Sequence, residues 1–170
     1  FGSYFYGDVS VSSNGAVTVT SDNARATGIF ASSSLGSVSV EAGGSIDVSG
    51  YDRAFGIDAR SNYGDVEIAS YADINVSSSN YNAAGIRGLS EYYDVNIFNY
   101  GDVDVQAAGL AQGIVALSYY GNVGVRNEGD VTASSSGGYS QAVALRSGAG
   151  YDAVLRNFGS ITAGSGNSLA

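Results

Sequence analysis

The chain of 170 residues contains no Cys, His, Pro, Met, Trp or Lys, so it offers no disulfide, thiolate, imidazole or amine for catalysis or metal binding. Seven arginines against 16 acidic residues give a formal charge of -9, which is the wrong sign for binding nucleic acid. No apolar run approaches the ~18 residues of a membrane span, so we expect no membrane insertion.

The first 30 residues predict three short strands. Val9-Ser-Val11 and Val17-Thr-Val19 alternate apolar with polar residues, the period of a strand with one buried face. A third apolar element begins at Gly28-Ile29. Strands of three to five residues with Gly or Asn at the corners are therefore expected to form one coil.

The same three elements recur at intervals of about 28 residues, the mark of a repeat protein. The inward apolar columns are Val9, Val38, Val66, Val95, Val123; Val17, Ile46, Ile74, Val103, Val131, Ile161; and Ile29, Ile57, Ile86, Ile114, Val143. The chain thus divides into six coils that begin near residues 6, 35, 63, 92, 120 and 150.

This pattern predicts an all-β fold, a right-handed parallel β-helix (β-solenoid) that forms a single domain over residues 1–170. The coils have about 28 or 29 residues and three short strands each. An isolated coil buries too little apolar surface to offset the loss of conformational entropy, so stability must come from the stacking of neighbouring coils.

Stretches such as Tyr100-Gly-Asp-Val-Asp-Val and Arg126-Asn-Glu-Gly-Asp-Val-Thr-Ala resemble the β-solenoid passenger repeats of bacterial autotransporter and filamentous-haemagglutinin-type adhesins. The likeness covers the whole chain. It implies secretion to the bacterial surface and a role in adhesion, aggregation or fibre formation, and it carries over no binding residues.

Acidic residues recur at two corners of the predicted coil. Asp8, Asp65, Asp94 and Asp152 share the first corner, and Asp73, Asp102 and Asp130 share the second. Asp favours such turns through bonds to the local backbone. A calcium site at Asp73, Asp102 and Asp130 is the alternative, because a divalent cation would relieve the repulsion between stacked carboxylates. We otherwise expect no cofactor.

Aromatic residues also recur in register. One row contains Tyr6, Leu35, Tyr63, Tyr92 and Tyr120, and a shorter one contains Tyr71, Tyr100 and Phe158. Such rows either cover the edge of the core or provide a stripe that binds carbohydrate, a host surface or a laterally packed copy. Asn99, Asn127 and Asn157 predict a hydrogen-bonded amide ladder.

The two ends of the chain resemble complementary parts of one coil. The sixth coil has two strands and ends where the third is due, around Leu169 and Ala170, while Phe1, Gly2, Tyr4 and Phe5 precede the first coil. Residues 1–5 are therefore expected to complete the last coil of a neighbouring copy. Their deletion should leave a folded monomer.

These observations predict a non-catalytic, extracellular fibre subunit that assembles head to tail. One alternative is a fragment of a monomeric adhesin passenger. A second is a polysaccharide-acting β-helix enzyme using Asp102 and Asp104, which are two apart in the sequence. Loops that could form a cleft for a sugar chain are missing from the repeat.

Overall fold

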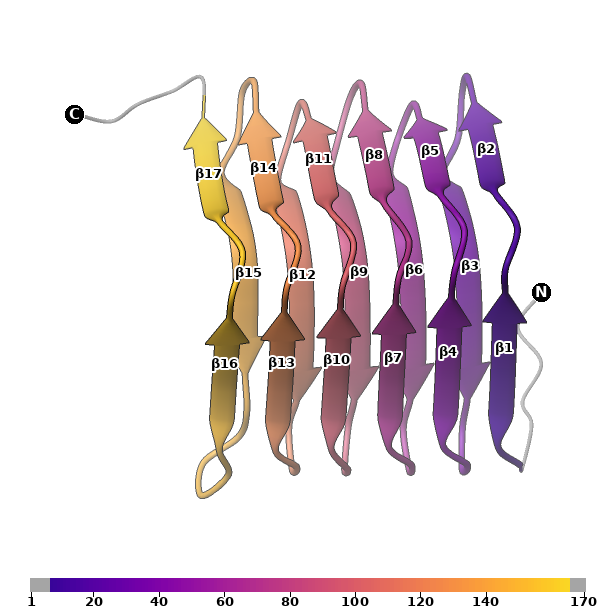
Figure 1. Cartoon of the computed structure of the whole chain (residues 1–170), viewed down its shortest axis with the longest axis vertical. Helices are drawn as coiled ribbons and strands as arrows, with labels where there is room; N and C mark the ends of the chain where they lie inside the picture. The colour runs from indigo at the N-terminus through magenta and orange to yellow at the C-terminus, as the bar shows by residue number, and fades with distance from the viewer. Residues whose placement is uncertain (1–6, 166–170) are drawn as a thin grey trace.

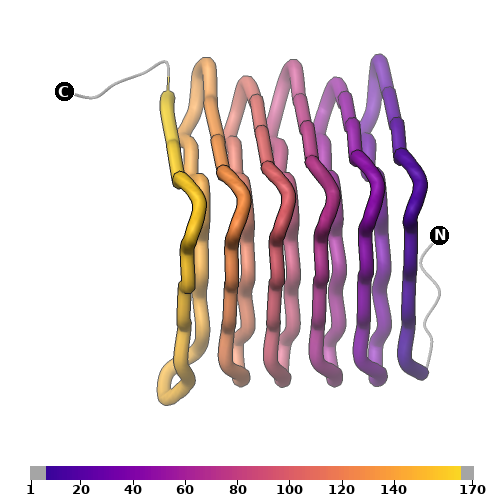
Figure 2. Tube along the Cα trace, viewed as in Figure 1, coloured from indigo at the N-terminus to yellow at the C-terminus, as the bar shows by residue number. Residues whose placement is uncertain are grey.

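The structure, a computed structural model, describes residues 7–165 as a parallel β-solenoid. Each coil runs along the front of the molecule, returns behind it and advances by one strand toward the C-terminal end (Figures 1 and 2). This sense of winding is right-handed. The described residues form five complete coils and the first two strands of a sixth, which confirms the predicted fold.

The strands lie in three parallel sheets, each built from one strand per coil. The first sheet contains β1 (Val9–Ser13), β4 (Val38–Ala42), β7 (Val66–Ser70), β10 (Val95–Asn99), β13 (Val123–Asn127) and β16 (Ala153–Asn157). The second contains β2 (Val17–Ser21), β5 (Ile46–Gly50), β8 (Ile74–Ser78), β11 (Val103–Ala107), β14 (Val131–Ser135) and β17 (Ile161–Ser165). The third contains β3 (Ala26–Ser33), β6 (Ala54–Ser61), β9 (Ala83–Ser90), β12 (Ala111–Ser118) and β15 (Ser140–Arg146).

The third-sheet strands are longer than the sequence predicted. β3, β6, β9 and β12 have eight residues and β15 has seven, against an expected maximum of five. The sequence pattern hid this length because these strands do not alternate strictly. In β6, for example, Gly56 and Ile57 are consecutive and both buried.

The predicted apolar columns form the core, with strands paired in the expected register. Val66, Ile74 and Ile57 represent the three columns in the second coil and its neighbour, and all are fully buried. Stacked β-branched side chains pack well on a pleated surface, which accounts for the dominance of Val and Ile.

A column of glycines lets the second and third sheets approach each other closely. A Cβ atom at Gly85 would overlap Cγ1 of Val103, and one at Gly113 would overlap Cγ1 of Val131. The valines lie on second-sheet strands and the glycines on third-sheet strands. The recurring Gly-Ile pair is therefore a packing requirement of the cross-section.

Candidate functional site

The corner aspartates bond to the backbone of the next coil. Oδ1 of Asp73 accepts the N–H of Asp102, and Oδ1 of Asp102 accepts the N–H of Asp130. Asp130 in turn accepts the N–H of Ser160, and this bond lowers the pKa of the Asp130 carboxyl. Each carboxylate thus satisfies a backbone donor at a turn, between strand ends.

The first corner repeats this arrangement. Asp65 accepts the N–H of Asp94, and Asp94 accepts the N–H of Asn122. No group of three or more acidic side chains able to hold a metal ion occurs among residues 7–165. The geometry therefore gives Asp73, Asp102 and Asp130 a role in turn formation.

The first aromatic row contains a continuous stack of phenol rings. Tyr63 and Tyr92 lie 4.6 Å apart between ring centroids, and Tyr92 and Tyr120 lie 5.2 Å apart, with nearly parallel planes. The interaction of its hydroxyl with Tyr63 raises the pKa of Tyr92. Because both faces of the Tyr92 ring are covered, the middle of the stack presents ring edges and hydroxyls instead of a flat platform for a sugar.

The second aromatic row is shorter than predicted. Tyr71 and Tyr100 stack with a centroid distance of 4.7 Å. Glu128 occupies the equivalent position in the next coil, because Asn99 pairs with Asn127 and Asn127 with Asn157. Phe158 is therefore separated from Tyr100 by a full coil, and the guanidinium of Arg126 lies over its ring.

The predicted amide ladder is present at the end of the first-sheet strands. Nδ2 of Asn99 donates to Oδ1 of Asn127 over 2.7 Å, and Nδ2 of Asn127 donates to Oδ1 of Asn157 over 2.8 Å. Oδ1 of Asn99 and Oγ of Ser70, its neighbour in register, are buried and have no hydrogen-bond partner among the described residues. The ladder thus begins at an unsatisfied pair.

At the end of the third-sheet strands, buried serines that were not predicted as site residues form hydrogen bonds to the preceding coil. Ser61 donates to the carbonyl oxygen of Gly36, and Ser90 donates to that of Gly64. Ser118 donates to the carbonyl of Tyr93. The signal was available, because these buried serines recur in register with the apolar columns.

The sequence analysis also missed a buried carboxylate on the outer side of the third sheet. Asp58 on β6 is 0% exposed and bonds to three guanidinium groups. Arg87 and Arg60 each contact both of its oxygens, at 2.7 to 2.9 Å, and Arg25 contacts Oδ2 at 3.0 Å. The Cζ atoms of Arg25 and Arg87 both lie over the ring of Phe55, at 4.6 and 4.0 Å from its centroid.

These contacts determine the ionisation of Asp58. Burial by itself raises the pKa of the carboxyl, but hydrogen bonds from Arg87 and Arg60, together with their charges, lower it by more. The pKa of Asp58 consequently lies below its usual range. Ion pairs in this geometry hold Asp58 ionised even though no part of it reaches solvent.

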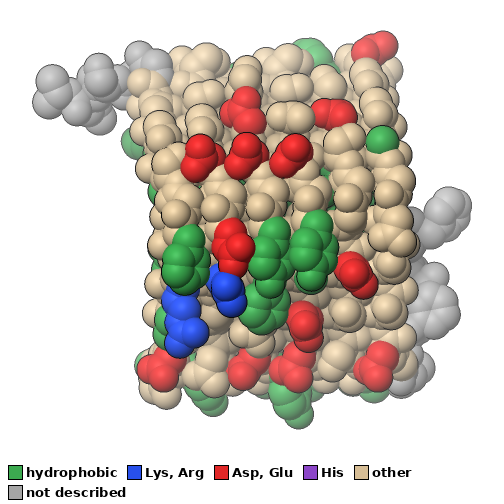
Figure 3. All heavy atoms as spheres, in the orientation of Figure 1, with side chains coloured by type: hydrophobic (Ala, Val, Ile, Leu, Met, Phe, Trp, Pro, Cys, Tyr) green, Lys and Arg blue, Asp and Glu red, His purple; other side chains and the backbone are tan. Residues whose placement is uncertain are grey.

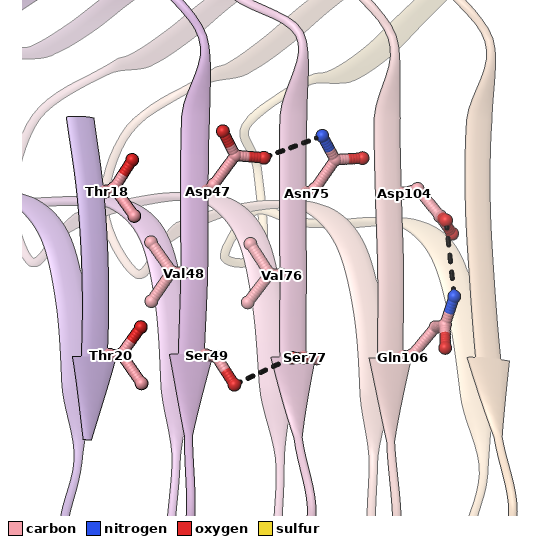
Figure 4. Close-up of a pocket in the computed structure, with 10 residues that line it drawn as sticks. All are labelled: Thr18, Thr20, Asp47, Val48, Ser49, Asn75, Val76, Ser77, Asp104 and Gln106. Atoms are coloured by element: carbon pink, nitrogen blue, oxygen red, sulfur yellow. Dashed lines mark hydrogen bonds between the residues drawn. The ribbon is translucent and has the colours of Figure 1, made fainter. Parts of the chain in front are cut away.

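A shallow hollow of about 270 Å³ lies on the outer face of the second sheet (Figure 4). Two rows of polar side chains cross the strands there. They are Thr18, Asp47, Asn75 and Asp104, and Thr20, Ser49, Ser77 and Gln106. Asp47 accepts a bond from Asn75, and Asp104 accepts one from Gln106. Asp102 is not in this lining, so the proposed carboxylate pair is not brought together in it.

Apolar core side chains are exposed at the C-terminal end of the described solenoid. Leu155 is in register with Val125, Ile97 and Ile68, and Ile161 belongs to the column of Ile74. Leu155 and Ile161 are 42% and 40% exposed, whereas Ile68 and Ile74 are fully buried. β16 and β17 are the last strands of their sheets, as β1 and β2 are at the other end. Both ends therefore present unpaired edges among the described residues.

Several predicted site residues lie outside the described residues 7–165. They are Phe1, Gly2, Tyr4, Phe5, Tyr6, Leu169 and Ala170. The expectation that residues 1–5 complete a neighbouring coil stays a prediction.

Comparison of the chain with known protein families, with curated proteins and with solved structures finds no match. Among residues 7–165 no helix is long and apolar enough to cross a membrane. Interpretation of the function therefore rests on the geometry of the solenoid itself.

Proposed function

We propose that the protein is a non-catalytic structural subunit of an extracellular bacterial fibre, in which copies stack head to tail along the solenoid axis. The observation that carries the proposal is the exposure of Leu155 and Ile161 on strands that are the last of their sheets among residues 7–165. The resemblance to adhesin passenger repeats supports the location outside the cell.

Strand direction favours head-to-tail contact. All pairing in the solenoid is parallel, so β16 of one copy pairs with β1 of the next in the same geometry that joins β13 to β16. Two identical ends placed face to face would bring the strands together in antiparallel orientation. Head-to-tail contact is heterologous and does not close, and it therefore generates a filament.

The hydrogen-bonded rows fix the register of this contact. The backbone N–H of Asp152 donates to Asn122, as the N–H of Asn122 donates to Asp94 and that of Asp94 to Asp65. In a stacked pair the carboxylate of Asp152 accepts the N–H of Asp8 in the next copy. The amide of Asn157 extends its ladder to Ser13 of the next copy, which occupies the equivalent strand position.

Substitution of adjacent residues on β16 tests the proposal. Leu155→Asp places a charge in the apolar column of the end face, so filaments seen by electron microscopy and sedimentation should be lost while the circular dichroism of a folded solenoid remains. Val154→Asp is the matched control, because Val154 precedes Leu155 on the same strand and is in register with Gly124 and Asn96, which occupy outward positions. This control should still polymerise.

The same rows of side chains would also run through a longer monomeric adhesin passenger, which is the second candidate. A wild-type chain that stays monomeric at high concentration would overturn the fibre and favour the adhesin. Hydrolysis of an acidic polysaccharide that is abolished by Asp102→Asn or Asp104→Asn would instead establish the enzyme.

The aromatic stack of Tyr63, Tyr92 and Tyr120 supports side-by-side contact of filaments through its exposed ring edges.

A further inference from the structure

Charged side chains are divided unequally between the two sides of the solenoid. Five of the seven arginines lie on the third sheet or immediately before its strands. They are Arg25, Arg53, Arg60, Arg87 and Arg146. The sole carboxylate among the described residues of these strands is Asp58. The third-sheet strands, with the residue immediately before each, therefore carry a formal charge of +4, although the chain as a whole carries -9. Asp52 and Glu91 border these segments and are counted with the corners.

The remaining 15 carboxylates belong to the first and second sheets and to the corners. With Arg126 and Arg156 they give the rest of the molecule a formal charge of -13, which together with +4 accounts for the -9 of the chain. Figure 3 shows rows of acidic side chains and few basic ones on the face formed by the two six-stranded sheets. Asp47, Asp104, Glu41 and Glu67 point outward there.

The basic side retains free hydrogen-bonding capacity. Arg60 and Arg87 donate hydrogen bonds to Asp58 from Nε and Nη2, and Arg25 donates one from Nη2. The Nη1 groups of these three arginines donate no hydrogen bond to the described residues. Arg53 and Arg146 are exposed and form no ion pair among residues 7–165. The ring of Phe30 is also exposed on this side.

We propose that the third-sheet side binds the acidic face of a second copy of this chain, so that solenoids associate face to back. The two surfaces of one molecule are complementary in charge, which favours their contact. The strands of both surfaces have the same spacing of about 4.8 Å, so rods lying parallel place the basic side of one copy along the acidic face of the other. The contact is heterologous and leaves one free surface of each kind for a further copy.

The net charge does not prevent this contact at moderate salt. Packed sheets lie about 10 Å apart, and the Debye length at 0.1 M salt is about 10 Å. At this salt concentration each surface therefore interacts mainly with the charges of the surface packed against it, and the rest of the partner's charge is screened. At 0.01 M the Debye length of about 30 Å exposes the partner to the whole charge, and two copies repel. At 1 M, with a Debye length of about 3 Å, the attraction is screened.

Association should consequently pass through a maximum near 0.1 M salt, which neither apolar contact nor simple repulsion produces. Sedimentation velocity across this salt range measures it. The chain used carries Leu155→Asp, which removes end-to-end stacking, so the result is independent of the proposed fibre. If the wild-type chain forms no fibre, the maximum of association near 0.1 M salt should still be observed. If the two faces do not bind each other, the maximum should be absent while end-to-end stacking of the wild-type chain is unaffected.

Two double variants with the same net charge identify the surface. Arg53→Glu with Arg146→Glu should weaken association about tenfold or more, because it reverses exposed charges on the basic side and leaves the contacts of Asp58 intact. Arg126→Glu with Arg156→Glu changes the net charge equally on the acidic side and should not weaken it. Mixing the first variant with an Asp47→Arg, Asp104→Arg chain should restore binding.

Equal weakening by the two double variants would overturn the proposal, because net charge alone would then explain the effect. Association that rises steadily with salt would overturn it in favour of apolar contact. Retention of the chain on a sulfated polysaccharide without self-association at 0.1 M salt would overturn it as well, since the basic side would then bind a polyanion.

Discussion

At the scale of the residue, Asp58 is a charged side chain whose burial requires compensation by its neighbours. Its carboxylate is fully buried and depends on Arg25, Arg60 and Arg87 for all of its ion pairs. Replacing one member of such a group leaves the opposite charges without partners, which costs more than a surface ion pair contributes.

Asp58→Asn should therefore lower the free energy of unfolding at pH 7 by about 2 to 3 kcal/mol, because three partly exposed guanidinium groups lose their anion. Urea denaturation measures the change. Asp104→Asn, which removes an outward carboxylate on β11, is the control and should change stability by less than about 0.5 kcal/mol.

We also expect the free energy of unfolding of wild type and Asp58→Asn to depend differently on pH. The pKa of Asp58 in the folded protein is lowered relative to about 3.9 in the unfolded chain. Its contribution is thus fully present above the unfolded pKa and is lost as the pH falls through the folded pKa. The stability gap between wild type and Asp58→Asn should narrow below about pH 4; a gap that widens in acid would contradict the assignment.

At the scale of the element, most of the described strands end in Ser or Asn at the corner. Asn99, Asn127 and Asn157 fill this position on β10, β13 and β16, and Ser70 fills it on β7. Because strands in register share an environment, the residue at one position determines which partners the next coil requires. The unsatisfied Ser70 and Asn99 mark the point where amide changes to hydroxyl.

Ser70→Asn should extend the amide ladder by one strand and stabilise the protein by about 1 kcal/mol. Its Nδ2 would donate to Oδ1 of Asn99, as Asn99 donates to Asn127, leaving one unsatisfied buried atom instead of two. Thermal unfolding measures the gain. Ser70→Ala removes the hydroxyl without satisfying Asn99, so it should gain less; a greater stability of the alanine variant would rule out the ladder mechanism.

At the scale of the whole molecule, stability is shared among nearly equivalent coils. Strands contact their equivalents in the adjacent coils, so the described rod has no central element on which all others depend. The charge division between its two sides is a property of the same scale, because it requires residues from all of the described coils.

Removal of one whole coil should therefore be tolerated. Deleting residues 95–122 removes β10, β11 and β12 and joins Asp94 to Val123, which keeps every remaining strand in register. This variant should fold cooperatively with a lower melting temperature, as measured by calorimetry, because one coil interface is lost. Deleting residues 95–108 removes two of the three strands and should be far less stable. Comparable stability of the two deletions would contradict a register-dependent solenoid.

The sequence alone was sufficient for the number of strands in each coil and for their register. Val and Ile recur at intervals of 28 to 30 residues in three columns, and a period of two assigns the buried face within the short strands. Asn99, Asn127 and Asn157 could be paired for the same reason, since they lie 28 and 30 residues apart, about one coil each, and residues one coil apart are in contact along the axis. In a repeat protein, residues that are one repeat apart in the sequence become neighbours in the structure.

Features that depend on side chains from unequal positions were decided only by the tertiary structure. Arg25, Arg60 and Arg87 occupy different positions in their coils, so no column reveals that they converge on Asp58. The length of the third-sheet strands was hidden by their irregular alternation. The net charge of -9 likewise concealed a basic side, because a sum over the chain contains no direction, and only the folded arrangement separates arginines from carboxylates in space.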